Sequence, residues 1–140
     1  MQLSKIIKEN ALAYHVAFID VATINKIGIG KATFLGMEEV AKKLFKKVTN
    51  PYLLIDALEI PNSKIPQRGI IRGDSLSISI AAASIIAKVA RDKLMDELSF
   101  KFFQYGLEKN KGYGTKFHRI SIGKHGVTEL HRTDFCRKYI

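Results

Sequence analysis

Apolar side chains between residues 31 and 47 recur at helical spacing, which predicts an amphipathic helix. The positions that share this spacing are Phe34, Leu35, Met37, Val40, Ala41, Leu44 and Phe45. Lysines near the end of this segment interact favourably with the negative, C-terminal end of the helix dipole. Asn50-Pro51 prevents the helix from continuing. A shorter helix is predicted for residues 3–11, with Asn10 as its stop.

Short runs of aliphatic, aromatic and β-branched residues predict strands at residues 12–19 and 52–55, and a further short strand is expected at residues 68–71. The second of these runs is wholly apolar, so we expect it to be buried. Residues 21–29 have an ambiguous pattern, with glycines at Gly28 and Gly30, so no element is assigned to them. Residues 60–66 contain two prolines and are predicted to be a loop.

The segment 70–95, IIRGDSLSISIAAASIIAKVARDKLM, joins a strand-like run to a long helix. We expect residues 74–105 to be mostly helical, with one break near Ser99 and with Asp74 as the N-cap. Residues 81–87 are almost all small or apolar, so the start of this helix should be buried. Residues 106–140 are predicted to form loops and short helices.

Strands separated by helices indicate an α/β fold. The chain has 140 residues and 46% hydrophobic content, enough for a single domain over residues 1–140 with its own core. The longest apolar run, residues 78–86, is too short to span a membrane, and no signal peptide opens the chain. Cys136 is the single cysteine, which suits a reducing compartment and predicts a cytoplasmic protein without a membrane partner.

Two carboxylates are the first candidates for chemistry. Asp56 ends an apolar strand, and in open α/β sheets sites form at that edge. Asp74 follows the next strand, where a structural role as N-cap competes with a functional one. Two such carboxylates can hold Mg²⁺ or Mn²⁺ with several waters, and two-metal sites of this kind cleave phosphodiesters.

The charge of the chain is lopsided. Lysine and arginine total 23 against 13 acidic residues, and residues 101–140 hold nine basic and three acidic residues. Aromatic side chains are interleaved with these charges: Tyr105, Tyr113, Phe117, Phe135 and Tyr139. Such a segment is typical of a nucleic-acid-binding surface, although a solvated face on a small basic protein explains the composition equally well.

The name basic segment is used for residues 106–140, which are predicted to form the loops and short helices of the C-terminal part. Within it, Gly112 and Gly114 flank Tyr113 and let the backbone approach a ligand closely. The alternative is a turn with a packed tyrosine. His118, His125 and His131 lack metal-ligand spacing and partner cysteines, so no zinc site is expected. The residues predicted to contact nucleic acid are Lys111, Tyr113, Lys116, His118 and Arg132.

Residues 70–95 resemble the signature of the type 2 ribonucleases H, specifically bacterial ribonuclease HII. Further segments agree with that family in order, and they are residues 32–37, 54–56, 65–68, 110–115, 125–126 and 131–135. The resemblance implies a ribonuclease H-like mixed sheet flanked by helices, with a helical C-terminal segment. It also implies an endonuclease of DNA replication and repair. Such an enzyme cleaves the RNA strand of RNA–DNA hybrids and cuts 5′ of single ribonucleotides in duplex DNA.

Carried over by position, the resemblance makes Asp56 and Asp74 two of the family's four catalytic carboxylates, with Mn²⁺ or Mg²⁺ as cofactor. It makes Tyr113 the ring that stacks on the sugar at the RNA–DNA junction. The chain departs from the family in lacking the N-terminal strand that carries Asp-Glu-Ala-Gly-Arg-Gly. A smaller departure is Ala57, where the family usually has glycine.

The missing strand leads to two expectations. Without it, residues 52–56 have an open apolar edge, so we expect marginal stability or self-association through that edge. We also expect impaired cleavage by this truncated chain, because two carboxylates hold metals poorly. The alternatives are a non-catalytic remnant that binds RNA–DNA hybrid or duplex, and an unrelated α/β binding domain.

Overall fold

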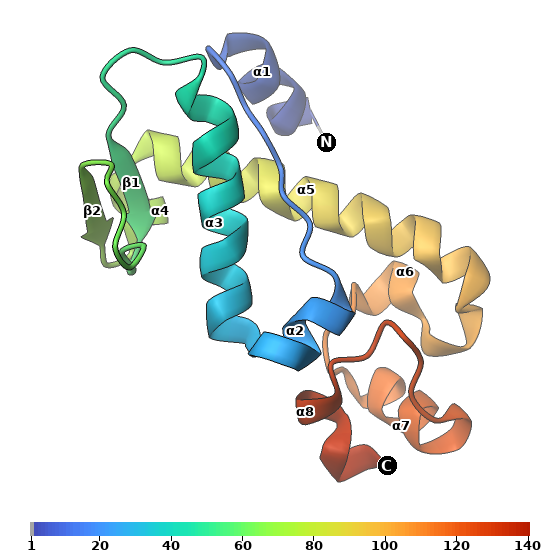
Figure 1. Cartoon of the computed structure of the whole chain (residues 1–140). Coiled ribbons are helices and arrows are strands. Elements are labelled where there is room, and N and C mark those ends of the chain that lie inside the picture. Colours follow the sequence, from blue (N-terminus) through green and yellow to red (C-terminus); the bar gives the residue numbers. More distant parts are fainter. Residues whose placement is uncertain (1) are drawn as a thin grey trace. The chain divides into compact units, whose positions relative to one another are not determined.

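Two short strands run parallel in the computed structural model, which describes residues 2–140 (Figure 1). Strand β1 (Leu53–Asp56) pairs with β2 (Gln67–Ile70), in a register that sets Asp56 opposite Ile70. Both strands were predicted from the sequence. The expected burial of β1 is wrong, because its side chains alternate between half-buried and exposed and Leu54 is 42% exposed.

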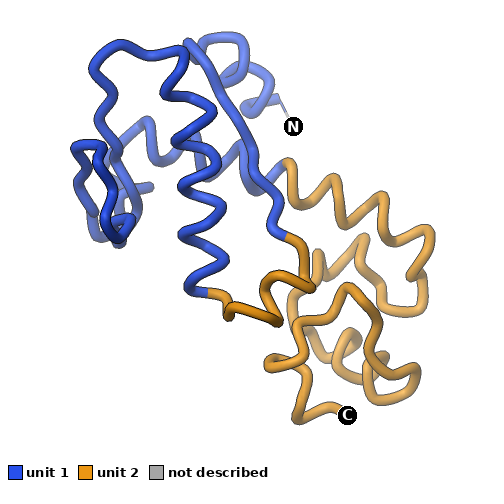
Figure 2. The backbone as a smooth tube through the Cα atoms, viewed as in Figure 1, with its two compact units in different colours: residues 1–19, 30–89 blue, residues 20–29, 90–140 orange. Residues whose placement is uncertain are grey.

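The described chain divides into two compact units, coloured separately in Figure 2. The first comprises the residues up to 19 together with residues 30–89, and the second comprises residues 20–29 and 90–140. A single domain over residues 1–140 stays a prediction. None of the helices in residues 2–140 is long and apolar enough to cross a membrane.

In the first unit, helices α1 (Gln2–Asn10) and α3 (Ile29–Phe45) confirm the two helices predicted there. The loop after β2 leads into α4 (Gly73–Leu76) and then α5 (Ile78–Lys101), which contributes residues to both units. Buried apolar side chains of this unit are Ala32, Ala41, Ile60, Ile80 and Ile86.

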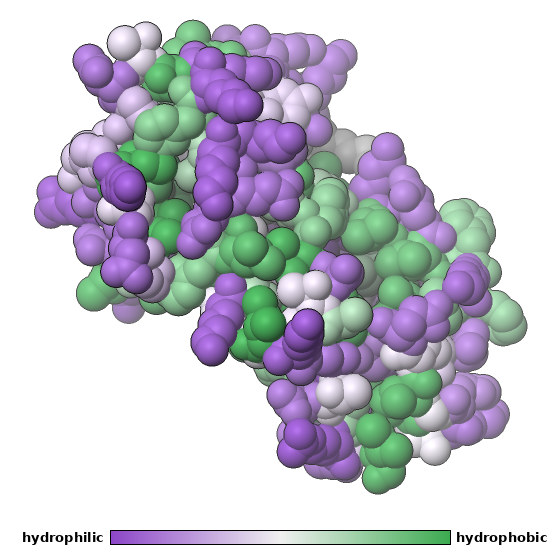
Figure 3. Space-filling model, viewed as in Figure 1, coloured by the Kyte–Doolittle hydropathy of each residue, from purple (hydrophilic) through white to green (hydrophobic). Residues whose placement is uncertain are grey.

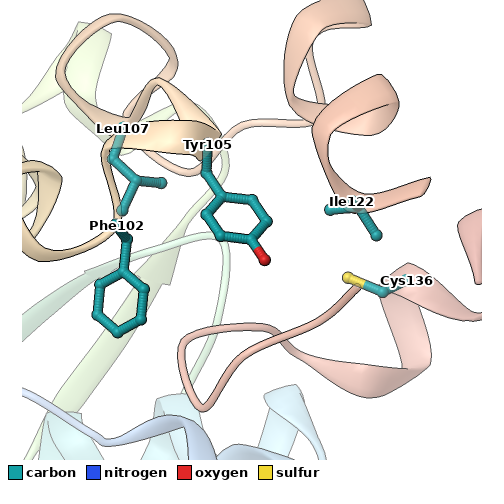
Figure 4. Packing of buried hydrophobic residues seen from close by; sticks show 5 residues of the cluster. All are labelled: Phe102, Tyr105, Leu107, Ile122 and Cys136. Atoms are coloured by element: carbon teal, nitrogen blue, oxygen red, sulfur yellow. The ribbon is translucent and has the colours of Figure 1, made fainter. Parts of the chain in front are cut away.

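The second unit is built from helices. Its elements are α2 (Val21–Ile27), the later part of α5, η1 (Phe103–Tyr105), α6 (Leu107–Asn110), α7 (Lys116–His125), α8 (Thr133–Cys136) and η2 (Arg137–Tyr139). Tyr105 lies at the centre of the core, only 1% exposed, with Phe102 and Leu107 on one side and Ile122 and Cys136 on the other (Figure 4). Its hydroxyl donates to the carbonyl of Gly126 at 2.9 Å. The short helices predicted for this segment are therefore confirmed.

The strand predicted at residues 12–19 is wrong. Residues 13–20 have no regular secondary structure, and in the described chain no segment pairs with them. A strand needs a hydrogen-bonded neighbour, because its backbone groups cannot pair within the segment. The segment packs instead against α3, where a Cβ on Gly36 would lie 3.4 Å from Cγ1 of Ile19.

The helix break predicted near Ser99 lies instead at Ser77, which adopts an extended conformation between α4 and α5. Asp74 is not the N-cap as predicted, because Arg72 caps α4 with φ of 55° and Asp74 lies in its first turn. The start of the long helix is buried only in part, because Ile80 and Ile86 are buried whereas Ile78 is largely exposed.

The fold is α/β, and it is mostly helical. The mixed sheet that the family resemblance implied is reduced, within residues 2–140, to a single parallel pair. Many large apolar side chains therefore stay exposed, and Figure 3 shows green apolar surface among purple hydrophilic side chains on the face in view.

A substitution at Gly69 in β2 tests how tightly this strand is packed against the loop between β1 and β2. An added Cβ would lie 2.7 Å from the backbone carbonyl oxygen of Leu58, which cannot move like a side-chain end. We expect Gly69→Ala to lower the free energy of unfolding by about 1–3 kcal/mol, as overpacking does. Gly30→Ala is the matched control, because nothing lies within 4 Å of its Cβ. Denaturant titration of both variants measures the difference, and equal stability of the two would contradict the packing described.

Candidate functional site

The end of β1 and the start of α4 are joined by one hydrogen bond. The backbone N–H of Gly73 donates to Oδ1 of Asp56 at 2.8 Å. Gly73 is buried, and a Cβ there would lie 2.6 Å from Cδ1 of Ile80 and 3.4 Å from the Asp56 carboxylate. The glycine therefore permits a close approach, and it brings Asp74, the next residue, to the same end of the strand pair.

Both carboxylates of this pair, Asp56 and Asp74, are exposed and have no ion-pair partner among residues 2–140. Oδ1 of Asp74 accepts a long hydrogen bond of 3.4 Å from the Ser75 hydroxyl. Two hard oxygen donors with uncompensated charge fit Mg²⁺ or Mn²⁺, ions that bind through one or two carboxylates and keep several waters. Within the described chain no third acidic, histidine or cysteine side chain joins them.

Tyr113 lies on the loop between α6 and α7 and is 59% exposed. Lys111 and Gly112 both have positive φ, 49° and 76°, and turn the chain sharply before the tyrosine. Buried Asn110 stabilises this turn, because its side chain donates to the carbonyl of Tyr105 and accepts from the N–H of Gly112. The turn thus presents an exposed tyrosine rather than a packed one.

The basic residues predicted to contact nucleic acid have different surroundings. Lys111 forms an ion pair with Asp96 on α5. Lys116 is exposed at the first position of α7, and the guanidinium of Arg132 lies 4.3 Å from the ring centroid of Phe135. Lys116 is therefore the best placed of the three to meet a phosphate group.

His118 and His131 form a buried pair, 5% and 7% exposed, with Nε2 atoms 3.2 Å apart. The backbone N–H of Thr128 donates to Nδ1 of His131 at 2.9 Å, so the proton of a neutral His131 belongs on Nε2. That proton is donated to Nε2 of His118, whose own Nδ1–H is donated to the carbonyl of Tyr113 at 2.9 Å. His118 is therefore not exposed to solvent, and its hydrogen bond to the carbonyl of Tyr113 stabilises the backbone of the tyrosine loop.

Arg91 and Asp96 of α5 contact the Tyr113 loop but were missed in the sequence analysis. Arg91 bonds to the carbonyl of Lys111, twenty positions away, and Asp96 pairs with the Lys111 side chain, fifteen positions away. Arg91 lies inside the family-like segment 70–95 and Asp96 directly after it, but nothing in the sequence pattern indicates a contact with a residue twenty or fifteen positions away.

The sequence model of the family described as Ribonuclease HII matches residues 1–138 of this chain. The chain therefore belongs to the ribonuclease HII family, a family of hydrolases. This finding confirms the resemblance drawn from residues 70–95.

Curated relatives with this name agree with the family match. Ribonuclease HII of Desulfitobacterium hafniense (strain DSM 10664 / DCB-2) is 52% identical over 130 residues, covering 93% of this chain and 49% of the relative. Ribonuclease HII of Caldicellulosiruptor bescii is 45% identical over 136 residues, covering 97% of this chain and 65% of the relative. That of Caldanaerobacter subterraneus subsp. tengcongensis is 42% identical over 139 residues, covering 99% and 57%. The chain thus spans about half to two thirds of the length of these relatives.

The buried histidine pair predicts how the stability of the second unit depends on pH. Burial, and then the neighbouring His118, hold the pKa of His131 below its usual value. The unfolded chain therefore binds more protons than the folded one as pH falls below about 6.5, the pKa of an unfolded histidine. We expect full stability above that pH and a declining free energy of unfolding as pH falls towards the lowered pKa.

Thermal unfolding between about pH 7.5 and pH 5.5 measures this dependence. His131→Gln removes the titrating group and should flatten the profile. His125→Gln is the control, because it leaves the His118–His131 contact in place and should keep the pH dependence of the wild type. Equal pH profiles for the wild type and His131→Gln would show that the pair does not titrate on unfolding.

Proposed function

We propose that this chain is a metal-dependent endoribonuclease. It would cleave the RNA strand of RNA–DNA hybrids and cut 5′ of single ribonucleotides in duplex DNA. The observation that carries the proposal is the pair Asp56 and Asp74, which the Gly73–Asp56 hydrogen bond keeps at one end of the strand pair in a member of this family. This function would serve DNA replication and repair in the cytoplasm.

Asp56 and Asp74 are the residues that would hold Mn²⁺ or Mg²⁺. Such an ion, when bound, supplies an activated water for attack on the phosphodiester and stabilises the leaving oxygen. The Gly73 N–H donates to Oδ1 of Asp56, so its other carboxylate oxygen would be the one available to an ion. Asp74 has only the long contact with Ser75 and can turn towards the same ion.

The basic segment, residues 106–140, would bind the nucleic acid. Its charge attracts phosphates, and the exposed ring of Tyr113 is available to stack on the sugar at the RNA–DNA junction. Lys116 would contact the backbone directly. Lys111, His118 and Arg132 would add to the surface or support it, since each already has a partner within the second unit.

A second candidate function is binding of hybrid or junction duplex with little cleavage. One observation favours it: the described chain contributes only two carboxylates to the metal site, while the basic segment is well folded. Tyr52, directly before β1, and Leu54 within it are exposed, and the outer edge of β1 is unpaired in the described chain. Self-association through that edge would therefore accompany this second function. We therefore expect weak cleavage by these 140 residues.

Cleavage of a duplex DNA that carries one ribonucleotide, in Mn²⁺ and in Mg²⁺, tests the function. We expect slow cutting on the 5′ side of the ribonucleotide. Asp56→Asn and Asp74→Asn should each reduce the rate by about 100-fold or more, because each removes a charged metal ligand. Glu108→Gln is the control for losing one exposed acid elsewhere. Cleavage unaffected by either aspartate variant would contradict the proposed site, and binding without cleavage would favour the second candidate.

The salt dependence of duplex binding separates stacking from phosphate contacts. Tyr113→Ala should weaken binding about tenfold, because stacking on an aromatic ring contributes about 1–3 kcal/mol, without changing the salt slope. Lys116→Ala should reduce the magnitude of the slope of log K against log salt by about one, which corresponds to the loss of one phosphate contact. Fluorescence anisotropy at several salt concentrations measures both. A reduced slope in Tyr113→Ala would show that the tyrosine does not act by stacking.

A further inference from the structure

We infer that Arg91 is a positioning residue that fixes the ring of Tyr113 for stacking, an inference that rests on the proposed function. The guanidinium carbon of Arg91 lies 4.4 Å from the centroid of the Tyr113 ring. Its Nη2 atom donates a hydrogen bond of 3.0 Å to the carbonyl of Lys111. One side chain on α5 thus holds both the ring and the backbone of the same loop.

This double contact depends on the chemistry of arginine. The guanidinium is planar and always charged, so it can stack on an aromatic face while an N–H at its edge donates to a carbonyl. Lysine has a compact ammonium on a flexible stem and cannot make both contacts with one rigid group. Arg91 is half-buried, so the stem is already ordered by packing before any ligand arrives.

Neighbouring residues of α5 also contact the Tyr113 loop. A Cβ on Gly112 would lie 3.5 Å from Sδ of Met95 and 3.8 Å from Nη2 of Arg91, so the turn sits directly on this helix. Asp96 pairs with Lys111 on the other side of the turn. Residues 111–113 are therefore held along one stretch of α5 by stacking, packing and charge.

From α7, His118 donates to the carbonyl of Tyr113 and fixes the backbone of the same residue. That contact leaves the side chain of Tyr113 unrestrained, whereas the guanidinium of Arg91 lies over its ring. With Tyr113 59% exposed, the ring still offers surface to a sugar. A ring that is ordered before binding loses less conformational entropy on binding, so the complex should be tighter.

Binding of a duplex DNA with one ribonucleotide to the 140-residue chain tests this role through a double-mutant cycle. We expect Arg91→Ala to weaken binding about threefold or more, the range for one such cation–π contact. Arg91→Lys should restore little of the loss. In a Tyr113→Ala background, Arg91→Ala should have no further effect, because a positioning residue acts only through the residue that it positions.

Arg119→Ala is the matched control. It removes one exposed arginine that also lies over a tyrosine ring, that of Tyr139 at 5.9 Å, and so measures the effect of losing one positive charge. Arg91→Ala should leave the salt slope of binding unchanged. Additive effects of Arg91→Ala and Tyr113→Ala, or a reduced salt slope in Arg91→Ala, would overturn the inference and make Arg91 a phosphate contact.

A measurement without nucleic acid keeps this inference separate from the proposed function. In the free chain with ¹³C-labelled tyrosine, the ring resonances of Tyr113 should shift in Arg91→Ala and stay in place in Arg119→Ala. The resonances of buried Tyr105 report that each variant is folded. Unchanged Tyr113 resonances in a folded Arg91→Ala would overturn the inference. Unchanged binding in Tyr113→Ala would instead count against the proposed role of Tyr113, whatever the resonances show.

Discussion

The hydrogen bond from the Gly73 N–H to Asp56 is the contact on which the candidate metal site depends. It joins the end of β1 to the start of α4, and a Cβ at position 73 would require the side-chain end of Ile80 to shift, since it would lie 2.6 Å from Cδ1 of that residue. Asp74 is carried to the same place by its position beside Gly73. A charged hydrogen bond of this kind is short and directional, so it fixes the first carboxylate while the second stays adjustable.

The second unit organises a different surface around the buried ring of Tyr105. Asn110 links this core to the turn before Tyr113, and the His118–His131 pair links it to the backbone of Tyr113 itself. These polar contacts are buried and fully partnered, which makes them strong and specific. The exposed loop is consequently held by hydrogen bonds from Asn110 and His118, although it has no regular secondary structure.

Much of the fold could be read from the sequence where local signals act alone. The helical spacing after residue 31 and the apolar run of β1 predicted elements that the structure contains, and β2 was also expected. Residues 12–19 failed because a strand also needs a partner, which propensity does not report. The segment of α2 stayed open because its pattern is ambiguous, and in the structure Asp20 caps this helix by accepting from the N–H of Thr23 at 2.6 Å. Asp56 and Asp74 stood out at strand ends, whereas Arg91 joins a site only through distant contacts.

Asp56 and Asp74 would together form one cation site. Titration of the chain with Mn²⁺, followed by the electron paramagnetic resonance of the free ion, tests it without requiring cleavage. The account predicts binding by the wild type, weaker binding by Asp56→Asn and by Asp74→Asn, and unchanged binding by Glu108→Gln. Equal Mn²⁺ binding by the wild type and by the Asp56→Asn, Asp74→Asn double variant would contradict it.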